Sequence, residues 1–306
     1  MSLKRILFMG TPQYATIIFK SLFDNHFNIL SIITQPDKPV GRKNFLQPPH
    51  IKKFVIDNNI DIKILQPSSL KDYYVYEYIK TLKPDYIIVA AYGHILNKRI
   101  LEIAPCINLH ASLLPLYRGA SPIQESIINN DKYTGVTAML MNEGLDTGDI
   151  LGFRYFKLEN NITIDKLFLD LSKIASKLII EVLNRFDGIS PKKQDNLDSS
   201  LCKKIQKSYG QIKFDNALEI YIKYRAYLNW PGIFLESGLK LKDISLIDTL
   251  ITNQEGEILS INKDYIIVGC KKGSLEIKTI QVPSKKPLSS FEYIKGYRLK
   301  IGDVLN

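Results

Sequence analysis

An amide and an imidazole lie two positions apart in the stretch INLHASLLP, as Asn108 and His110. If this stretch is a strand, both side chains project from the same face, because neighbouring side chains alternate along a strand. An amide donor beside a protonated imidazole suits the stabilisation of a carbonyl oxygen that gains negative charge. A structural interpretation stays equally open, in which both side chains cap the strand by bonding to the main chain.

A carboxylate lies between two glycines in the stretch EGLDTGD, where Asp146 follows Gly144 and precedes Gly148. Two glycines so close to an acid indicate a shaped loop, from which the carboxylate would orient His110 and relay protons. The competing interpretation is an ordinary turn held by an Asx hydrogen bond. A calcium loop would need alternating acidic ligands and a zinc site would need paired histidines, so we expect no metal.

The elements that would position these residues follow from the apolar pattern. Strands are expected at residues 5–9, 29–34, 85–91, 106–110, 137–141 and 151–156, with helices between them and a long helix over 163–186. Strands that alternate with helices are typical of an α/β fold with a mostly parallel, doubly wound sheet. Ligands of such sheets bind beyond the carboxyl ends of the strands, here near residues 9–11, 91–93 and 108–110.

The second part of the chain has a different pattern. A polar segment with Gly, Pro and Ser predicts a linker over residues 188–208, between domains at residues 1–187 and 209–306. Beyond one helix near residues 216–228, short β-like runs are separated by turn residues. Such spacing predicts a small antiparallel barrel.

The composition is that of an ordinary globular protein. The 306 residues are 45% hydrophobic and 24% charged, which is enough for two domains of about 150 residues with sizeable cores. No apolar run approaches the ~20 residues of a membrane span, and Gly10 ends the first apolar stretch too early for a secretory signal. Three scattered cysteines predict reduced thiols, so we expect a cytoplasmic protein.

The net charge of +10 favours a polyanionic partner, although a compositional bias toward lysine explains the same excess. A long loop at residues 35–49 carries Arg42 and Lys43 close to Phe45. Basic and aromatic side chains together suit the end of a single-stranded nucleic acid, and the alternative is a solvated surface loop. The turn at Gly10 lacks the further glycines of a dinucleotide fingerprint, which disfavours a nucleotide cofactor.

Taken together, five blocks of sequence resemble the 10-formyltetrahydrofolate-dependent formyltransferases over essentially the whole chain. The blocks are FMGTPQYA, TQPDKPVGR, AAYGHIL, INLHASLLPLYRGASPIQ and TAMLMNEGLDTGDIL. The resemblance implies a Rossmann-like catalytic domain followed by a small OB-like β-barrel that binds tRNA. It also implies that a monomer transfers the formyl group of 10-formyltetrahydrofolate, without a metal, to the α-amino group of methionyl-initiator tRNA for translation initiation.

The resemblance also assigns roles to individual positions. Its catalytic trio, in which the first two residues stabilise a tetrahedral intermediate and the third orients and relays protons, is Asn108, His110 and Asp146. Its folate-binding residues are Ser112, Leu113, Leu114, Pro115, Ala90, Tyr92 and Gly93. Its tRNA contact is Arg42, and we expect Lys43 and Phe45 of the same basic and aromatic loop to bind beside it. The chain departs from the family pattern at Asn44, Leu116 and Tyr117, which concerns tRNA docking rather than the chemistry.

Other acceptors and another class of protein stay open. The same trio would serve a formyltransferase that acts on glycinamide ribonucleotide or on an amino sugar, or a hydrolase that releases formate to water. The second domain and the basic charge favour tRNA over glycinamide ribonucleotide, whereas the sugar enzyme stays open because some such enzymes carry a different second domain. A non-catalytic RNA-binding protein would not need the intact trio.

Overall fold

The computed structural model describes residues 4–40 and 44–306, and the chain divides into two compact units. The first unit comprises Met1–Ile123, Lys132–Leu158 and Asp165–Lys203, and the second comprises Gln124–Asp131, Glu159–Ile164 and Lys204–Asn306. Residues 188–203, which the sequence pattern suggests as the first part of a linker, therefore group with the first unit.

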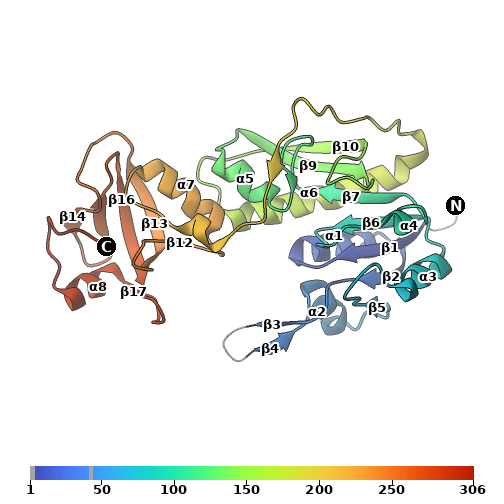
Figure 1. Cartoon of the computed structure of the whole chain (residues 1–306), viewed down its shortest axis with the longest axis horizontal. Coiled ribbons are helices and arrows are strands. Elements are labelled where there is room, and N and C mark those ends of the chain that lie inside the picture. The colour runs from blue at the N-terminus through green and yellow to red at the C-terminus, as the bar shows by residue number, and fades with distance from the viewer. Residues whose placement is uncertain (1–3, 41–43) are drawn as a thin grey trace. The chain divides into compact units, whose positions relative to one another are not determined.

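A seven-stranded sheet forms the centre of the first unit, in the order β10-β9-β7-β6-β1-β2-β5 (Figure 1). Its strands are β1 Arg5–Gly10, β2 Asn28–Ile33, β5 Ile64–Leu65, β6 Tyr86–Ala90, β7 Cys106–His110, β9 Tyr133–Leu140 and β10 Ile150–Lys157. The strands from β7 to β5 run parallel, whereas β9 and β10 are antiparallel to their neighbours. The expected mostly parallel α/β sheet is confirmed.

The central strands form because their side chains are apolar on both faces. In β1, the residues from Ile6 to Met9 are all fully buried. A continuous apolar run of this kind is the pattern of a parallel strand that is covered on both sides. The strand expected at residues 106–110 is β7, which has the same bounds.

The helices of the chain are α1 Gln13–Asp24, α2 His50–Asp57, α3 Tyr73–Leu82, α4 Lys98–Leu101, α5 Pro122–Ile128, α6 Ile164–Arg185, α7 Ala217–Tyr227 and α8 Ser290–Tyr297, with 3-10 helices η1 Phe186–Gly188 and η2 Lys207–Gly210. The longest, α6, buries a stripe that includes Leu167, Leu171, Leu178 and Val182, as the helical period requires. Across residues 4–40 and 44–306, no helix has both the length and the apolar character that crossing a bilayer requires.

Two pairs of very short strands lie outside the main sheet. In the loop at residues 35–49, β3 Lys38–Val40 and β4 Phe45–Gln47 form a hairpin. Elsewhere in the first unit, β8 Arg118–Gly119 pairs in parallel with β11 Leu201–Cys202. The sequence pattern predicts neither pair, because strands of two or three residues are too short to show alternation.

The second unit contains an antiparallel sheet in the order β12-β13-β16-β15-β14, with β17 beside β16. Its strands are β12 Ile233–Phe234, β13 Lys240–Asp248, β14 Ile258–Ile261, β15 Ile266–Gly269, β16 Ser274–Gln281 and β17 Leu288–Ser289. Alternate side chains of these strands are buried, among them Ile266, Val268, Leu275 and Ile277. The predicted small antiparallel β domain is confirmed.

Candidate active site

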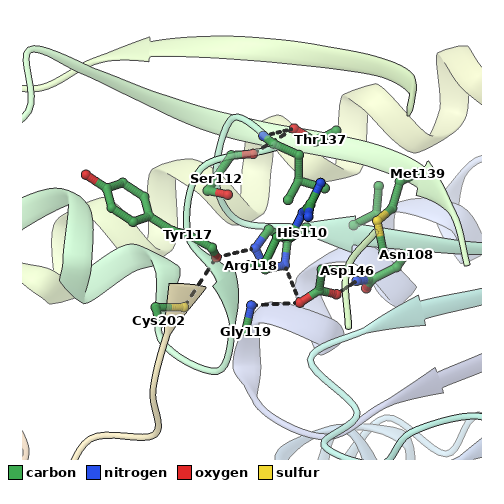
Figure 2. Close-up of polar contacts among 12 residues, drawn as sticks. Asn108, His110, Ser112, Tyr117, Arg118, Gly119, Thr137, Met139, Asp146 and Cys202 are labelled. Atoms are coloured by element: carbon green, nitrogen blue, oxygen red, sulfur yellow. Dashed lines mark hydrogen bonds and ion pairs between the residues drawn. The ribbon is translucent and has the colours of Figure 1, made fainter. Parts of the chain in front are cut away.

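The side chains of Asn108, His110 and Asp146 converge in the first unit (Figure 2). Asn108 and His110 lie on β7, and Asp146 lies in the loop that joins β9 to β10. The Asn108 amide donates to Asp146 Oδ1 over 3.3 Å, and His110 Nδ1 lies 3.6 Å from Asp146 Oδ2. The two-residue spacing on β7 thus brings both side chains to one carboxylate.

The turn that carries Asp146 has a shape that its sequence pattern explains. Asp146 itself has a φ of +53°. Two residues later, Gly148 lies so close to β9 that a Cβ would stand 1.6 Å from the backbone oxygen of Leu140. Any side chain at position 148 would therefore push the turn, and the carboxylate with it, away from the strand.

Two hydrogen-bond donors and the His110 ring surround the Asp146 carboxylate. The Asn108 amide donates to Oδ1, and the backbone N–H of Gly119 donates to Oδ2 over 2.9 Å (Figure 2). Gly119 has a φ of +124°, and a Cβ there would stand 2.2 Å from the backbone oxygen of Cys202. The carboxylate is therefore held from β7 and from β8 together, which restricts its rotation.

The imidazole of His110 is held at both nitrogens. Nε2 lies 2.8 Å from the backbone oxygen of Tyr117, and a carbonyl oxygen only accepts, so Nε2 carries a hydrogen. Nδ1 is left facing Asp146, where a second proton would make the ring an imidazolium beside a carboxylate. The side chain is only 6% exposed, so protein groups rather than water set its orientation. Sequence reasoning misses this contact, because the acceptor is a main-chain oxygen.

The residues expected to bind folate after β7 differ in exposure. Leu113 and Pro115 are half-buried, whereas Ser112 and Leu114 are buried. The Ser112 hydroxyl donates to the backbone oxygen of Leu116 over 2.6 Å, so it is already used within the loop. Leu113 and Pro115 are therefore the members of this group that keep side-chain surface for a ligand.

The residues expected to bind folate after β6 lie where three parallel strands end. The backbone oxygen of Tyr92 accepts from Thr11 Oγ1 over 3.2 Å and from Gln35 Nε2 over 3.1 Å. Thr11 follows β1 and Gln35 follows β2 closely, so these bonds tie the ends of β1, β2 and β6 together. Ala90 is fully buried, whereas Gly93 is exposed and has a φ of +86°.

Two buried polar atoms in this segment have no hydrogen-bond partner, the Tyr92 hydroxyl and His94 Nε2. Burial raises the pKa of Tyr92 to about 12, so its hydroxyl stays protonated as a donor. The centroids of the two rings are 5.3 Å apart. An unsatisfied buried polar atom costs about 1–3 kcal/mol, and a polar ligand group that reached either atom would remove that cost.

The loop expected to contact nucleic acid carries exposed apolar side chains on the hairpin β3–β4. Phe45 is 66% exposed and Leu46 is 71% exposed. Arg42 and Lys43, the basic residues expected beside them, lie outside the described residues. Large apolar side chains left in water in this way are typical of a surface that meets a partner.

A polar network holds the base of this hairpin. Asp37 forms an ion pair with Lys52 at 2.8 Å and accepts from Gln66 Nε2 over 2.7 Å. The hydrogen bonds from Lys52 and then from Gln66 hold the pKa of the Asp37 carboxyl below its usual value. Because the ion pair is partly exposed, its contribution to stability is modest.

The groups around β7 suit chemistry at a carbonyl carbon. A fixed amide N–H and an imidazole stabilise an oxyanion, and a neighbouring carboxylate holds or moves a proton. Sequence reasoning misses the Gly119 amide and the Tyr117 oxygen. It also misses the side chain of Gln194, which bonds to the turn that carries Asp146, and that of Arg118, which bonds to Gln194. Among the residues that the structure describes, no group of three or more His, Cys, Asp or Glu is placed to hold a metal ion.

This fold and this site define a class of protein. The profile of the family described as "Formyl transferase" matches residues 4–183, and that described as "Formyl transferase, C-terminal domain" matches residues 204–298. The chain belongs to the formyl transferase family.

Within that family, two similar curated proteins carry the name methionyl-tRNA formyltransferase. The protein from Nitratiruptor sp. is 56% identical over 98% of this chain and 99% of its own length. The protein from Campylobacter lari is 54% identical over 99% of this chain and its own full length.

Solved structures share the fold. Methionyl-tRNA formyltransferase from Clostridium thermocellum has a TM-score of 0.56 at 25% identity, covering 80% of this chain and 94% of its own. HypX from Aquifex aeolicus, crystallised with tetrahydrofolic acid, has a TM-score of 0.69 at 16% identity. The HypX match covers 98% of this chain but only 48% of HypX, so this chain spans about half the length of that protein.

Proposed function

We propose that this chain transfers the formyl group of 10-formyltetrahydrofolate to the α-amino group of methionyl-initiator tRNA, for translation initiation. The observation that carries the proposal is the convergence of Asn108, His110 and Asp146, in a chain whose relatives are named methionyl-tRNA formyltransferase. The acceptor and the donor are those of the family that the sequence resembles.

The amine itself needs little activation. An α-amino group has a pKa near ~8, so a substantial fraction is neutral at working pH and attacks the formyl carbon directly. Negative charge then develops on the formyl oxygen of the tetrahedral intermediate. The Asn108 amide has a second hydrogen beyond the one given to Asp146, which it would donate to that oxygen, and the His110 imidazolium would stabilise the oxygen through its positive charge.

Asp146 would manage the proton. As the new bond forms between the amine nitrogen and the formyl carbon, the amine loses a proton, and N10 of the folate gains one as its bond to carbon breaks. His110 Nδ1 and Asp146 Oδ2 are 3.6 Å apart, longer than a hydrogen bond, and such contacts often tighten only once substrate is bound. The Gly119 amide keeps the carboxylate oriented throughout. The reaction balances without a metal ion.

The folate would bind at the ends of β6 and β7. Leu113 and Pro115 present apolar surface for the pterin ring. His94 Nε2 is a buried polar atom without a hydrogen-bond partner, and the pterin ring has donors and acceptors that could bond to it. HypX, which has a similar fold, was crystallised with tetrahydrofolic acid.

The tRNA would meet the exposed hairpin and the second domain, residues 209–306. Phe45 offers a stacking surface, and Arg42 and Lys43 offer positive charge for the acceptor end. Every group of the proposed site comes from one copy of the chain, so we expect the monomer to be active, in the cytoplasm where initiation takes place.

The deciding experiment supplies purified protein with 10-formyltetrahydrofolate and one acceptor at a time. We expect rapid formylation of methionyl-initiator tRNA and much slower formylation of methionyl-elongator tRNA. Parallel reactions contain glycinamide ribonucleotide, a nucleotide-linked amino sugar, or water alone with release of formate as the readout. Faster turnover in any of these three than with initiator tRNA would overturn the proposal.

A further inference from the structure

Residues 192–203 are built into the first unit, although they lie between the two stretches that match the family profiles. Lys192 and Ile150 exchange backbone hydrogen bonds of 2.7 and 2.9 Å. Ser200 accepts from the backbone N–H groups of Tyr117 and Arg118, each over 2.8 Å. This segment therefore runs beside the loop that fixes the His110 ring and the Asp146 carboxylate.

Within this segment, Gln194 holds the turn that carries Asp146. Its Nε2 donates to the backbone oxygen of Asp146 over 2.9 Å and to that of Gly148 over 2.7 Å. An amide NH₂ has two hydrogens, so both are used on carbonyl groups on either side of Thr147. One side chain thus spans the turn whose carboxylate faces His110.

Arg118 in turn fixes the orientation of the Gln194 amide. Its Nε and Nη2 donate to Gln194 Oε1 over 3.0 and 2.8 Å, and its Nη1 donates to Asn196 Oδ1 over 3.0 Å. A guanidinium only donates, so the amide oxygen must face Arg118 and the NH₂ must face the turn. Arg118 is buried, and its charge polarises the amide, which strengthens the bonds that Nε2 donates.

We infer that Gln194, oriented by Arg118, is a positioning residue for Asp146. Gln194 bonds to the main chain of the turn and does not contact the reacting atoms. Its kinetic effect rests on the proposed function, because the reaction needs Asp146 within reach of His110 Nδ1. A displacement of about 1 Å at a catalytic group costs on the order of 100-fold in rate.

The test is Gln194→Glu, which keeps the size of the side chain and its acceptor for Arg118 but removes both hydrogens. Two carbonyl oxygens of the turn would then face a carboxylate, and the turn would move. We expect kcat for formyl transfer to fall about 10- to 100-fold, with the KM for each substrate within about twofold of the parent. A parental kcat would overturn the inference.

Asn97→Asp is the matched control, the same exchange of amide for carboxylate elsewhere in the first unit. Asn97 Nδ2 donates to the backbone oxygen of Leu70 over 2.8 Å, and its Oδ1 caps α4 through the N–H of Ile100. Aspartate keeps the cap and loses the donated bond. We expect this variant to lose stability as Gln194→Glu does, but to keep the parental kcat; an equal loss of kcat in both would mark a general effect and overturn the inference.

Hydrogen exchange at the Gly119 amide gives a readout that needs no substrate. This N–H donates to Asp146 Oδ2 over 2.9 Å, so it should exchange faster in Gln194→Glu and at the parental rate in Asn97→Asp. Unchanged exchange in Gln194→Glu would overturn the inference whatever the enzyme's acceptor is. If exchange responds but the parent formylates no methionyl-tRNA, the proposed function fails and the positioning role stands.

Discussion

The end of β7 and the hairpin β3–β4 are both proposed to meet substrate, yet they are built in opposite ways. At β7, the His110 side chain is 6% exposed and the Asp146 side chain 13% exposed, and several donors fix one carboxylate. On the hairpin, Phe45 and Leu46 are mostly in water, and Asp37 at its base is held by Lys52 and Gln66.

The difference fits the role proposed for each region. Bond making requires groups held within a fraction of an ångström, so the β7 site is buried and its hydrogen bonds are made before substrate arrives. Recognition of a large polyanion needs reachable surface, so the hairpin keeps its side chains exposed. Substitutions at β7 should therefore change kcat, and substitutions on the hairpin should change the KM for tRNA.

The largest effect is expected from His110→Ala. The variant loses the imidazolium that would stabilise the oxyanion and exchange a proton with Asp146, so kcat should fall by about 10³-fold or more. Asp146→Ala should lose a similar amount. Single-turnover rates with methionyl-initiator tRNA measure the loss, and circular dichroism verifies the fold; a kcat within tenfold of the parent for either variant would contradict the assigned chemistry.

Asn108→Ala should have the next largest effect. It removes one donor to the developing oxyanion, a loss of about 10²- to 10³-fold in kcat for a single donor. The KM for 10-formyltetrahydrofolate should change little, because the ground-state formyl oxygen is only weakly charged. If the KM rises and kcat stays at the parental value, Asn108 binds the ground state. A substitution at β7 would then change KM as one on the hairpin does, and the proposed contrast between the two regions would fail.

Phe45→Ala tests the other side of the comparison. Loss of a stacking surface costs about 1–3 kcal/mol per base, so the KM for tRNA should rise at least fivefold while kcat and the folate KM hold. Tyr155→Ala is a matched control, since Tyr155 on β10 is 65% exposed against 66% for Phe45. An equal rise in both variants would show a general effect of exposed aromatic side chains rather than recognition by the hairpin.

The smallest effect is expected from Asp37→Asn at the base of the hairpin. Because the folded pKa of Asp37 is lowered, its stabilising effect is complete above the unfolded pKa of about 4 and is lost as pH falls through the folded value. The variant should therefore melt slightly below the parent at pH 7, and the two should converge in acid. Asp57→Asn, at the exposed end of α2, is the control. If the difference in melting temperature between Asp37→Asn and the parent persists at the lowest pH, the stabilising effect of Asp37 does not come from its charge.

Much of the fold can be predicted because burial leaves a clear pattern. The fully apolar run of β1 and the two-residue spacing of Asn108 and His110 each have one geometric interpretation, and the structure agrees with both. The convergence with Asp146 is different, since a lone Asp between glycines does not show where its turn lies. The loop pattern left this role open beside an ordinary turn, and the family resemblance favoured the catalytic role.

Other parts of the molecule leave weaker signals. Gln194 lies in a polar segment without periodicity, so the sequence pattern favours a linker, and only its bonds to Asp146 and Gly148 show its place. Helix α8 is a different case, because Ser289 and Glu292 form a capping box whose signature is visible in the sequence. We expected only one helix in this domain, near residues 216–228, so α8 was missed although its capping signature is visible in the sequence.

The bonds around β8 and β11 decide how short an independent catalytic fragment can be. A polypeptide cut after residue 187 would strand the guanidinium of Arg118 and the N–H of Tyr117, because their acceptors on Gln194, Asn196 and Ser200 would be gone. One that ends at Lys203 retains all of these acceptors. The match to the family profile stops at residue 183. A truncation designed on homology alone would therefore remove Gln194, whose side chain bonds to the turn that carries Asp146.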